Sequence, residues 1–191
     1  MRRLIVRAAL GVILLSLQYA QACGTGTEWL CDIGHGIMMA ESQGKNGIVF
    51  SGYAYHTSAG AHWPTGQAAQ TTGDPLGLNE IPYGIGYART WYNNDTHEEY
   101  TLFGIAFADS FWQPEVHVGY TYQKYHSIFG SNNWEWGLGY TPMLLVKPEM
   151  TGEAPLILPA IGLTSTLKYK NVELMATWAN VIFVNAKVTL D

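Results

Sequence analysis

Four segments between residues 81 and 147 alternate large apolar or aromatic residues with small ones. Successive side chains of a β-strand point to opposite faces, so this alternation predicts strands with one bulky face and one small face. Turn residues interrupt the pattern about every ten residues, as they do between short antiparallel strands. The bulky face holds Tyr83, Ile85, Tyr87, Phe103, Ile105, Phe107, Val116, Val118, Tyr120, Tyr122, Trp134, Trp136, Leu138 and Tyr140, whereas the small face holds Gly84, Gly86, Ala88, Gly104, Ala106, Ala108, Gly119, Thr121, Gly137 and Gly139.

A closed β-barrel surrounded by lipid requires this kind of pattern. Large apolar residues that face outward match its lipid-facing surface, and closure pairs every backbone polar group between strands. Porin lumens are polar, whereas a lumen of glycine and alanine would be a narrow apolar slot that can hold a hydrocarbon chain. A second interpretation stays open, because small inward residues can also simply relieve crowding inside an eight-stranded barrel.

Eight segments have strand-like patterns, and eight is the smallest usual number of strands for such barrels. We therefore predict an all-β fold, an eight-stranded antiparallel transmembrane β-barrel with a short N-terminal amphipathic helix near residues 28–42. Residues 58–80 are rich in proline and glycine and are expected to form a long surface loop. The expected strands are residues 48–57, 81–92, 100–111, 115–127, 133–147, 155–166, 168–178 and 180–190.

The N-terminal residues have the organisation of an export signal. Three arginines precede an apolar run from Ala8 to Leu17, and Ala20-Gln21-Ala22 is a small-residue cleavage site. We divide the chain into a signal peptide at 1–22, an N-terminal segment with a possible interfacial helix at 23–47, and an outer-membrane barrel at 48–191. In an exported chain, Cys23 and Cys31 can form a disulfide that closes a small loop. Export followed by folding in lipid predicts the bacterial outer membrane.

Composition and spacing argue against several other classes of protein. The net charge of -5, without a basic cluster, makes nucleic acid an improbable partner. No spacing of histidine, cysteine or carboxylate residues indicates a metal site. The Gly-x-Gly pairs lie inside predicted strands rather than in a phosphate-binding loop, so we expect no metal and no cofactor.

Strand parity brings four polar residues to one end of the predicted barrel. If both termini lie on the periplasmic side, the odd-numbered strands end at the outer rim. His56 then ends the first strand, Asp109 and Ser110 end the third, and Lys147 ends the fifth. A histidine can accept the proton of a serine, a carboxylate can orient the histidine or an acceptor hydroxyl, and an ammonium can hold a phosphate. These groups above an apolar slot have the parts for acyl transfer, although isolated polar residues at strand ends are often only solvated.

Five stretches carry a resemblance to a known family. Tyr55-His56 is similar to the family's aromatic residue followed by its essential histidine, and 106–110 is similar to the Ala-Phe-x-Asp-Ser stretch that carries its essential aspartate and serine. The other three are Asn79-Glu80-Ile81-Pro82-Tyr83-Gly84, Gly137-Leu138-Gly139-Tyr140-Thr141 and Pro155-Leu156-Ile157-Leu158-Pro159. In their order and spacing, these stretches resemble the PagP family of lipid A palmitoyltransferases, from Trp29 onward.

The resemblance implies an enzyme of the outer membrane. It implies transfer of palmitate from the sn-1 position of a glycerophospholipid to a hydroxyl of a lipid A acyl chain. We expect the protein to act as a monomer. Carried over residue by residue, His56, Asp109 and Ser110 are the catalytic candidates, and Lys147 stands where the family has a functionally important arginine.

Departures from the family pattern modify this expectation. Thr121 stands where the family has a glycine at the floor of the acyl pocket, so we predict a preference for a chain somewhat shorter than palmitate. Ser51 replaces a proline beside one lateral opening of the barrel, while Pro82 keeps the partner proline there. Pro155 and Pro159 remain beside the second opening.

Two other functions are compatible with the sequence. The same groups would serve an outer-membrane esterase or lipid A deacylase with water as the acceptor. The chain could also be a non-catalytic structural barrel, in which case replacing Ser110 or His56 would change nothing beyond stability.

Overall fold

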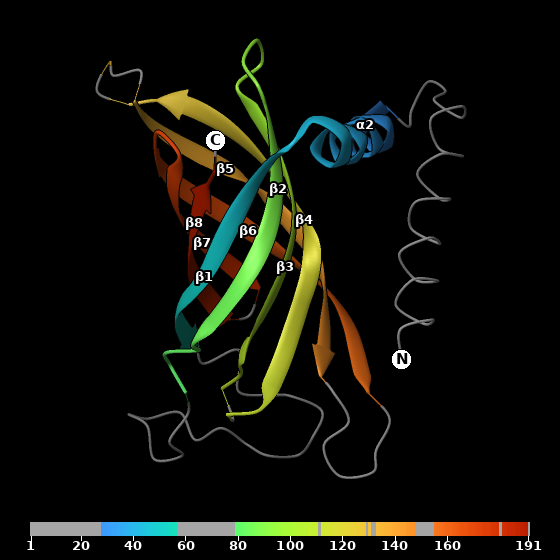
Figure 1. Ribbon diagram of the computed structural model, residues 1–191, viewed down its shortest axis with the longest axis vertical. Helices are drawn as coiled ribbons and strands as arrows, with labels where there is room; N and C mark the ends of the chain where they lie inside the picture. Colours follow the sequence, from blue (N-terminus) through green and yellow to red (C-terminus); the bar gives the residue numbers. More distant parts are fainter. Residues whose placement is uncertain are drawn as a thin grey trace.

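Eight antiparallel strands form a closed barrel with the neighbour order β1-β2-β3-β4-β5-β6-β7-β8 (Figure 1). The computed structural model describes residues 28–56, 79–110, 112–128, 130, 133–147, 155–179 and 181–190. One helix, α2 (Glu28–Gln43), precedes the barrel in this part of the chain. The strands are β1 (Lys45–His56), β2 (Gly84–Asn93), β3 (Glu98–Ala108), β4 (Pro114–Ser127), β5 (Trp134–Lys147), β6 (Leu156–Tyr169), β7 (Val172–Ala179) and β8 (Val181–Thr189).

The eight-stranded barrel predicted from the sequence is confirmed, and so is a short helix before it. Strand bounds differ from the expected ones by a few residues at most. The predicted signal peptide and nearly all of the predicted loop at 58–80 lie outside the described residues. No helix in the described part of the chain is both long and apolar enough to cross a membrane.

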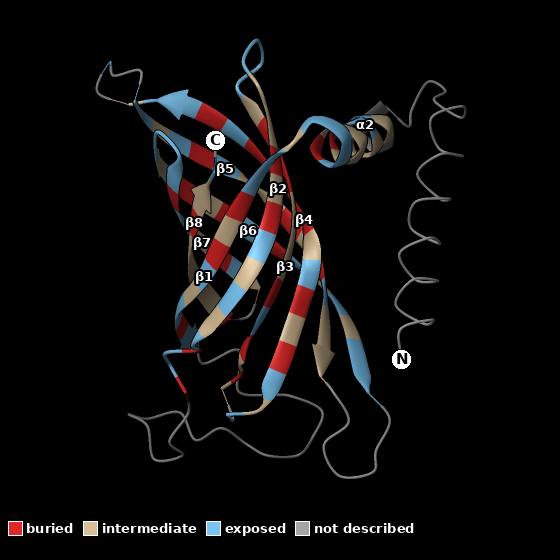
Figure 2. Ribbon diagram, viewed as in Figure 1, coloured by how far each residue is buried: buried red, intermediate tan, exposed pale blue. Residues whose placement is uncertain are grey.

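Buried and exposed residues alternate along the strands, as Figure 2 shows. On β2, Tyr83 before the strand and Ile85 within it are 69% and 60% exposed, so the predicted outward face is confirmed there. The same prediction is wrong for β3, because Ile105 and Phe107 are only 4% and 8% exposed and belong to the core with Phe103 packed against it.

Cross-strand pairing explains the reversed face of β3. Gly86 pairs with Ile105, and Gly84 pairs with Phe107. Directly paired residues share a face of the sheet, so the small inward face of β2 leaves room that the large residues of β3 fill. A Cβ on either glycine would overlap the side chain opposite. The lumen is therefore packed by large residues, rather than bounded by small residues on every strand.

Helix α2 covers part of the outer wall of the barrel (Figure 1). Tyr100 and Tyr120 face outward yet are buried, because Ala40, Ile33 and Ile37 of the helix region pack against them. The helix end is also tied to the wall by the Arg89 side chain, whose Nε donates to the Ala40 carbonyl oxygen at 3.2 Å. Burial of the barrel's aromatic rings against apolar helix residues holds the amphipathic helix at the end of the barrel where β1 begins (Figure 1).

Candidate functional site

The segment after β3 forms a tight turn that presents Asp109 and Ser110 at the barrel rim. The amide N of Gln113 donates to Asp109 Oδ1 at 2.8 Å, and the Asp109 N donates to the Gln113 carbonyl oxygen at 2.7 Å. Asp109 is only 5% exposed, whereas Ser110 is half-buried. Mutual hydrogen bonds of this kind hold a turn in one conformation, so the carboxylate has a defined direction.

Asn79 holds this turn in place through three hydrogen bonds. Its Nδ2 donates to the carbonyl oxygens of Ala108 and Asp109 at 3.1 and 3.2 Å, and its backbone N donates to the carbonyl oxygen of Ser110 at 2.8 Å. Asn79 is 2% exposed, so these bonds are protected from water. The asparagine of the resembling stretch at 79–84 therefore positions the two rim residues.

Lys147 reaches the rim from the last position of β5. Its Nζ lies 2.5 Å from Asp109 Oδ2 and 3.2 Å from Glu115 Oε2. The lysine side chain is 30% exposed, while the two carboxylates are 5% and 8% exposed. The structure thus brings together Lys147 and Asp109, which lie far apart in the sequence, with an ammonium that water or a ligand can still reach.

Glu115 and His117 extend this polar cluster below the rim, and the sequence did not identify them as part of the site. His117 Nε2 lies 2.6 Å from Glu115 Oε1, and both side chains are nearly buried. Their spacing of two residues on one strand is a sequence signal that both face the same way. His117 faces the lumen, where it lines a cavity and makes its contact with Glu115.

His56 is the last residue of β1, where its backbone pairs with Val181 of β8. Its side chain lies outside what the structure describes. Because β1, β3 and β5 run in the same direction around the barrel, His56 follows the strand to the same end as Asp109 and Lys147. Figure 1 shows these three strands ending together, at the end opposite to α2.

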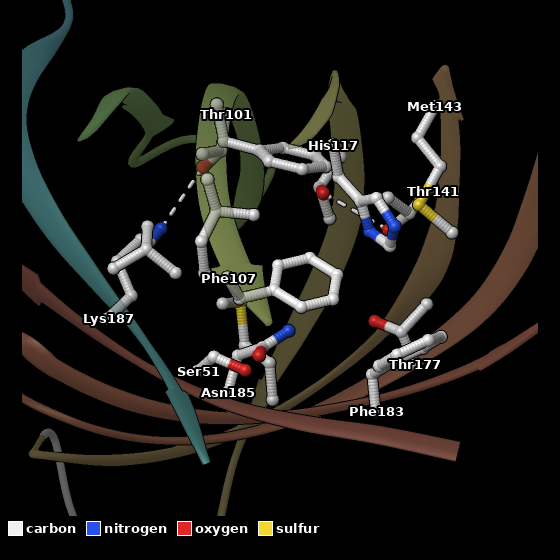
Figure 3. Close-up of a pocket in the computed structure, with 15 residues that line it drawn as sticks. Ser51, Thr101, Phe107, His117, Thr141, Met143, Thr177, Phe183, Asn185 and Lys187 are labelled. Carbon is white, nitrogen blue, oxygen red and sulfur yellow. Dashed lines mark hydrogen bonds between the residues drawn. The ribbon is translucent and has the colours of Figure 1, made fainter. Parts of the chain in front are cut away.

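A cavity lies in the lumen below the rim cluster (Figure 3). The rings of Phe107 and Phe183 meet the His117 ring nearly edge-on, with centroids 4.6 and 5.6 Å away. Glycine and alanine are absent among the described residues that line it. The lining is apolar at Val49, Phe103, Ile105, Phe107, Met143, Met175 and Phe183, and polar at Ser51, Thr101, His117, Thr121, Thr141, Thr177, Asn185 and Lys187.

Thr121 belongs to a belt of threonines at one boundary of the cavity. Its Oγ1 lies 3.0 Å from Thr141 Oγ1, which lies 2.6 Å from Thr164 Oγ1, and Thr177 Oγ1 continues the chain at 3.0 Å. Thr101 is the direct cross-strand partner of Thr121. Because these hydroxyls hydrogen-bond to one another, they can be buried across the lumen without water as a partner. Thr121 is part of this layer.

Beyond the threonine belt, the lumen is filled by buried charges. Lys187 is 0% exposed, and its Nζ lies 2.6 Å from Glu99 Oε1 and 3.0 Å from Glu173 Oε2. A second lysine, Lys168, lies 2.7 Å from Glu99 Oε2. The same Lys187 Nζ donates to Thr101 Oγ1 at 3.0 Å, and Thr101 pairs across the strands with Thr121, so the charged cluster lies next to the belt. The cavity therefore ends at a polar plug and does not continue as a channel through the described part of the lumen.

Two of the hydrogen-bonded ladders between neighbouring strands, β1–β2 and β6–β7, stop short of the rim. The β1–β2 ladder stops where Ser51 pairs with Gly84, although β1 continues to His56. The β6–β7 ladder begins only where Leu163 pairs with Trp178, although β6 starts at Leu156. An apolar groove crosses this second gap and is lined by Pro159, Ala160, Ile161, Gly162, Leu163, Trp178 and Ala179. Prolines remove backbone donors, so a break in the ladder beside Pro159 has a local cause.

Within the described residues, no group of three or more histidine, cysteine, aspartate or glutamate side chains has the arrangement of a metal site. The nearest approach to one, at Asp109, Glu115 and His117, already contains the Lys147 ammonium. The arrangement instead matches acid–base and electrostatic chemistry at an ester, with a buried carboxylate, an ammonium and a hydroxyl at the mouth of a lumenal cavity.

Fold and site together define a class: small closed barrels with a helix outside the wall and a polar rim above a blind cavity. Comparison with known proteins identifies the family within that class. The family model described as antimicrobial peptide resistance and lipid A acylation protein PagP matches residues 37–190, and the chain belongs to this family. The family recognised from the sequence stretches is thereby confirmed.

Individual relatives agree with the family match. A protein of Bordetella parapertussis named lipid A acyltransferase PagP is 25% identical over 174 residues, which cover 90% of this chain and 87% of that relative. The protein of the same name from Yersinia enterocolitica is 37% identical over 73 residues, which cover 37% of this chain and 34% of the relative.

Proposed function

We propose that this chain is an outer-membrane enzyme that moves a fatty acyl chain from a glycerophospholipid to a hydroxyl of lipid A. The observation that carries the proposal is the buried Asp109–Lys147 pair beside Ser110, directly above a blind lumenal cavity, in a member of a lipid A acylation family. A cavity closed at one end can hold the tail of an acyl chain while its ester stays at the rim.

The reaction that we propose exchanges one ester for another. The bond between the acyl carbonyl carbon and the sn-1 oxygen of the donor breaks, and the carbonyl carbon forms a bond with the acceptor hydroxyl oxygen. The acceptor proton ends on the departing glycerol oxygen, so the products are acylated lipid A and a lysophospholipid. His56 is the proposed carrier of this proton, as imidazole titrates near neutral pH.

Asp109, Ser110 and Lys147 have separate proposed roles. Ser110 lies on the turn held by Asn79 and contacts the reacting ester. Lys147 offers its partly exposed ammonium to a lipid phosphate, while Asp109 holds the lysine in place. Thr121, in the threonine belt, is the proposed floor against which the end of the acyl chain stops.

The outer surface of the barrel supports a membrane location. Tyr55, Tyr87, Leu138, Ile161 and Leu174 are all more than half exposed and come from five different strands. An apolar surface that continues around the barrel costs free energy in water and matches lipid. Lipid access through the β1–β2 and β6–β7 gaps and a monomeric state are part of the proposal; a closed barrel has no free sheet edge to pair with a second copy.

Mass spectrometry of the lipids tests this function. Refolded protein is incubated with lipid A and defined phospholipids, beside His56→Ala and Ser110→Ala and the matched controls His126→Ala and Ser165→Ala on the outer face. We expect lipid A to gain one acyl chain as lysophospholipid forms, with activity lost only in the first two variants. Free fatty acid without acylated lipid A would identify an esterase or deacylase instead. Unchanged lipids from a folded barrel would support a structural protein.

A further inference from the structure

His117 has a polar contact that the proposed chemistry does not use. It stands in the cavity wall between two phenylalanine rings and is 4% exposed. Its Nε2 lies 2.6 Å from Glu115 Oε1. Burying a polar ring in the wall of a slot for a hydrocarbon tail costs free energy unless hydrogen bonds compensate for the lost contact with water.

The contact joins the cavity wall to the rim. Glu115 Oε2, the other oxygen of the same carboxylate, lies 3.2 Å from Lys147 Nζ, which in turn lies 2.5 Å from Asp109 Oδ2. Four side chains on three successive segments of the barrel therefore form one continuous chain, with His117 at the cavity end and Asp109 at the rim end.

We propose that Glu115 and His117 are positioning residues for acyl transfer. Glu115 holds the Lys147 ammonium against Asp109, and His117, which the acyl chain touches, holds Glu115. This inference rests on the proposed function and deepens it. It links the binding of an acyl chain in the slot to the positions of Lys147 and Asp109 at the rim.

The physical basis is the flexibility of lysine. Its ammonium sits on a four-carbon stem with many rotamers, and a single carboxylate leaves several of them accessible. Two carboxylates from β4 and the turn after β3 restrict Lys147 to one position. When an acyl chain fills the slot it excludes water beside His117, and the ion pairs above it become stronger because the surroundings are less polar.

Substitutions that keep the size of each side chain test this role. Glu115→Gln removes the charge, His117→Leu removes the polar contact, and His117→Gln keeps an N–H that can donate to Glu115. We expect the first two to lower kcat about tenfold while KM for the phospholipid and the preferred chain length stay unchanged, because a hydrogen bond to a charged group is lost. His117→Gln should recover much of kcat. His126→Leu, on the same strand but on the outer face and away from the cavity, is the matched control and should retain kcat.

A double-mutant cycle separates positioning from general destabilisation. In a Lys147→Met background, Glu115→Gln should have no further effect on kcat, because Glu115 would act only through the lysine. Effects of the two substitutions that simply multiply would overturn the proposal. So would a changed KM or chain-length preference with an unchanged kcat, since that would make His117 only a wall of the slot.

Nuclear magnetic resonance provides a measurement that does not depend on activity. Folded protein labelled at histidine and lysine nitrogens is titrated with lysophosphatidylcholine as the single-chain probe. We expect the His117 ring and Lys147 Nζ signals to shift together, and the Lys147 shift to be lost in Glu115→Gln. Joint shifts in a wild-type protein that transfers no acyl chain would refute the proposed function but keep the linkage. If the wild-type protein transfers an acyl chain but its Lys147 signal does not shift when the probe is added, the linkage alone would be refuted.

Discussion

Replacing Thr121 with alanine should lengthen the acyl chain that the protein prefers. Thr121 is 6% exposed in the wall of the cavity, and the substitution removes only its Oγ1 and Cγ2 atoms. That space accepts about one more methylene, and a buried methylene contributes about 0.8 kcal/mol, so the preference for a chain one carbon longer should rise roughly fourfold. The lost hydrogen bond to Thr141 should cost about 1 kcal/mol of stability, while Thr141 keeps its bond to Thr164.

The matched control is Thr121→Val, which removes the hydroxyl but keeps the volume. Both variants receive an equimolar mixture of phospholipids that differ only in acyl length, and mass spectrometry gives the ratio of the acylated products. Only the alanine variant should shift toward longer chains, whereas both should lose similar stability. Equal shifts in the two variants, or none in the alanine variant, would refute the assignment of Thr121 as the floor.

Two further predictions concern stability, measured as the free energy of unfolding in micelles from denaturant titrations followed by tryptophan fluorescence. Gly36→Ala should destabilise the contact between α2 and the barrel by about 1–3 kcal/mol, because a Cβ there would overlap the Tyr100 ring. Gly34→Ala, where a Cβ meets nothing within 4 Å, should stabilise by up to about 1 kcal/mol, and equal effects would contradict the packing of the helix. Lys187→Met should cost about 3–5 kcal/mol because it removes the buried ammonium between Glu99 and Glu173 and leaves Lys168 to serve both buried carboxylates. Lys124→Met, which removes an exposed ion pair, should cost about 0–1 kcal/mol, and a similar loss in both variants would argue against the buried plug.

Much of the barrel could be predicted because its strands alternate in the sequence with a period of two. That period identifies which residues share a face, and it correctly grouped Phe103, Ile105 and Phe107. It does not say whether the shared face is directed to the lumen or to the outside, because large apolar residues suit both. The pairing with Gly84 and Gly86 decides this, and register is a property of the folded sheet.

The helix posed a similar problem. Tyr120 was expected outside, and it does face outward, but it is buried together with Tyr100 because α2 lies over both rings. The amphipathic pattern of the helix indicated that one face would be covered. It could not indicate that the partner would be the outer wall of the barrel.

The polar residues of the candidate site divide in the same way. Parity along the chain was enough to bring His56, Asp109 and Lys147 to one end of the barrel, because antiparallel strands must alternate in direction. The contact between Lys147 and Asp109, and the link through Glu115 to His117, depend on side chains from different strands meeting at a few ångströms.

The sequence by itself determined the closed barrel, the helix before it, the family and the end of the barrel at which the residues of the candidate site gather. These follow from local alternation, from strand direction and from ordered motifs, all of which are properties of the linear chain. Only the tertiary structure decided which face of β3 fills the lumen, that the threonines of several strands form one belt, and that a buried charge network closes the cavity. The reason is physical: hydrogen bonds and packing across a barrel depend on register and tilt between strands, which no single strand encodes.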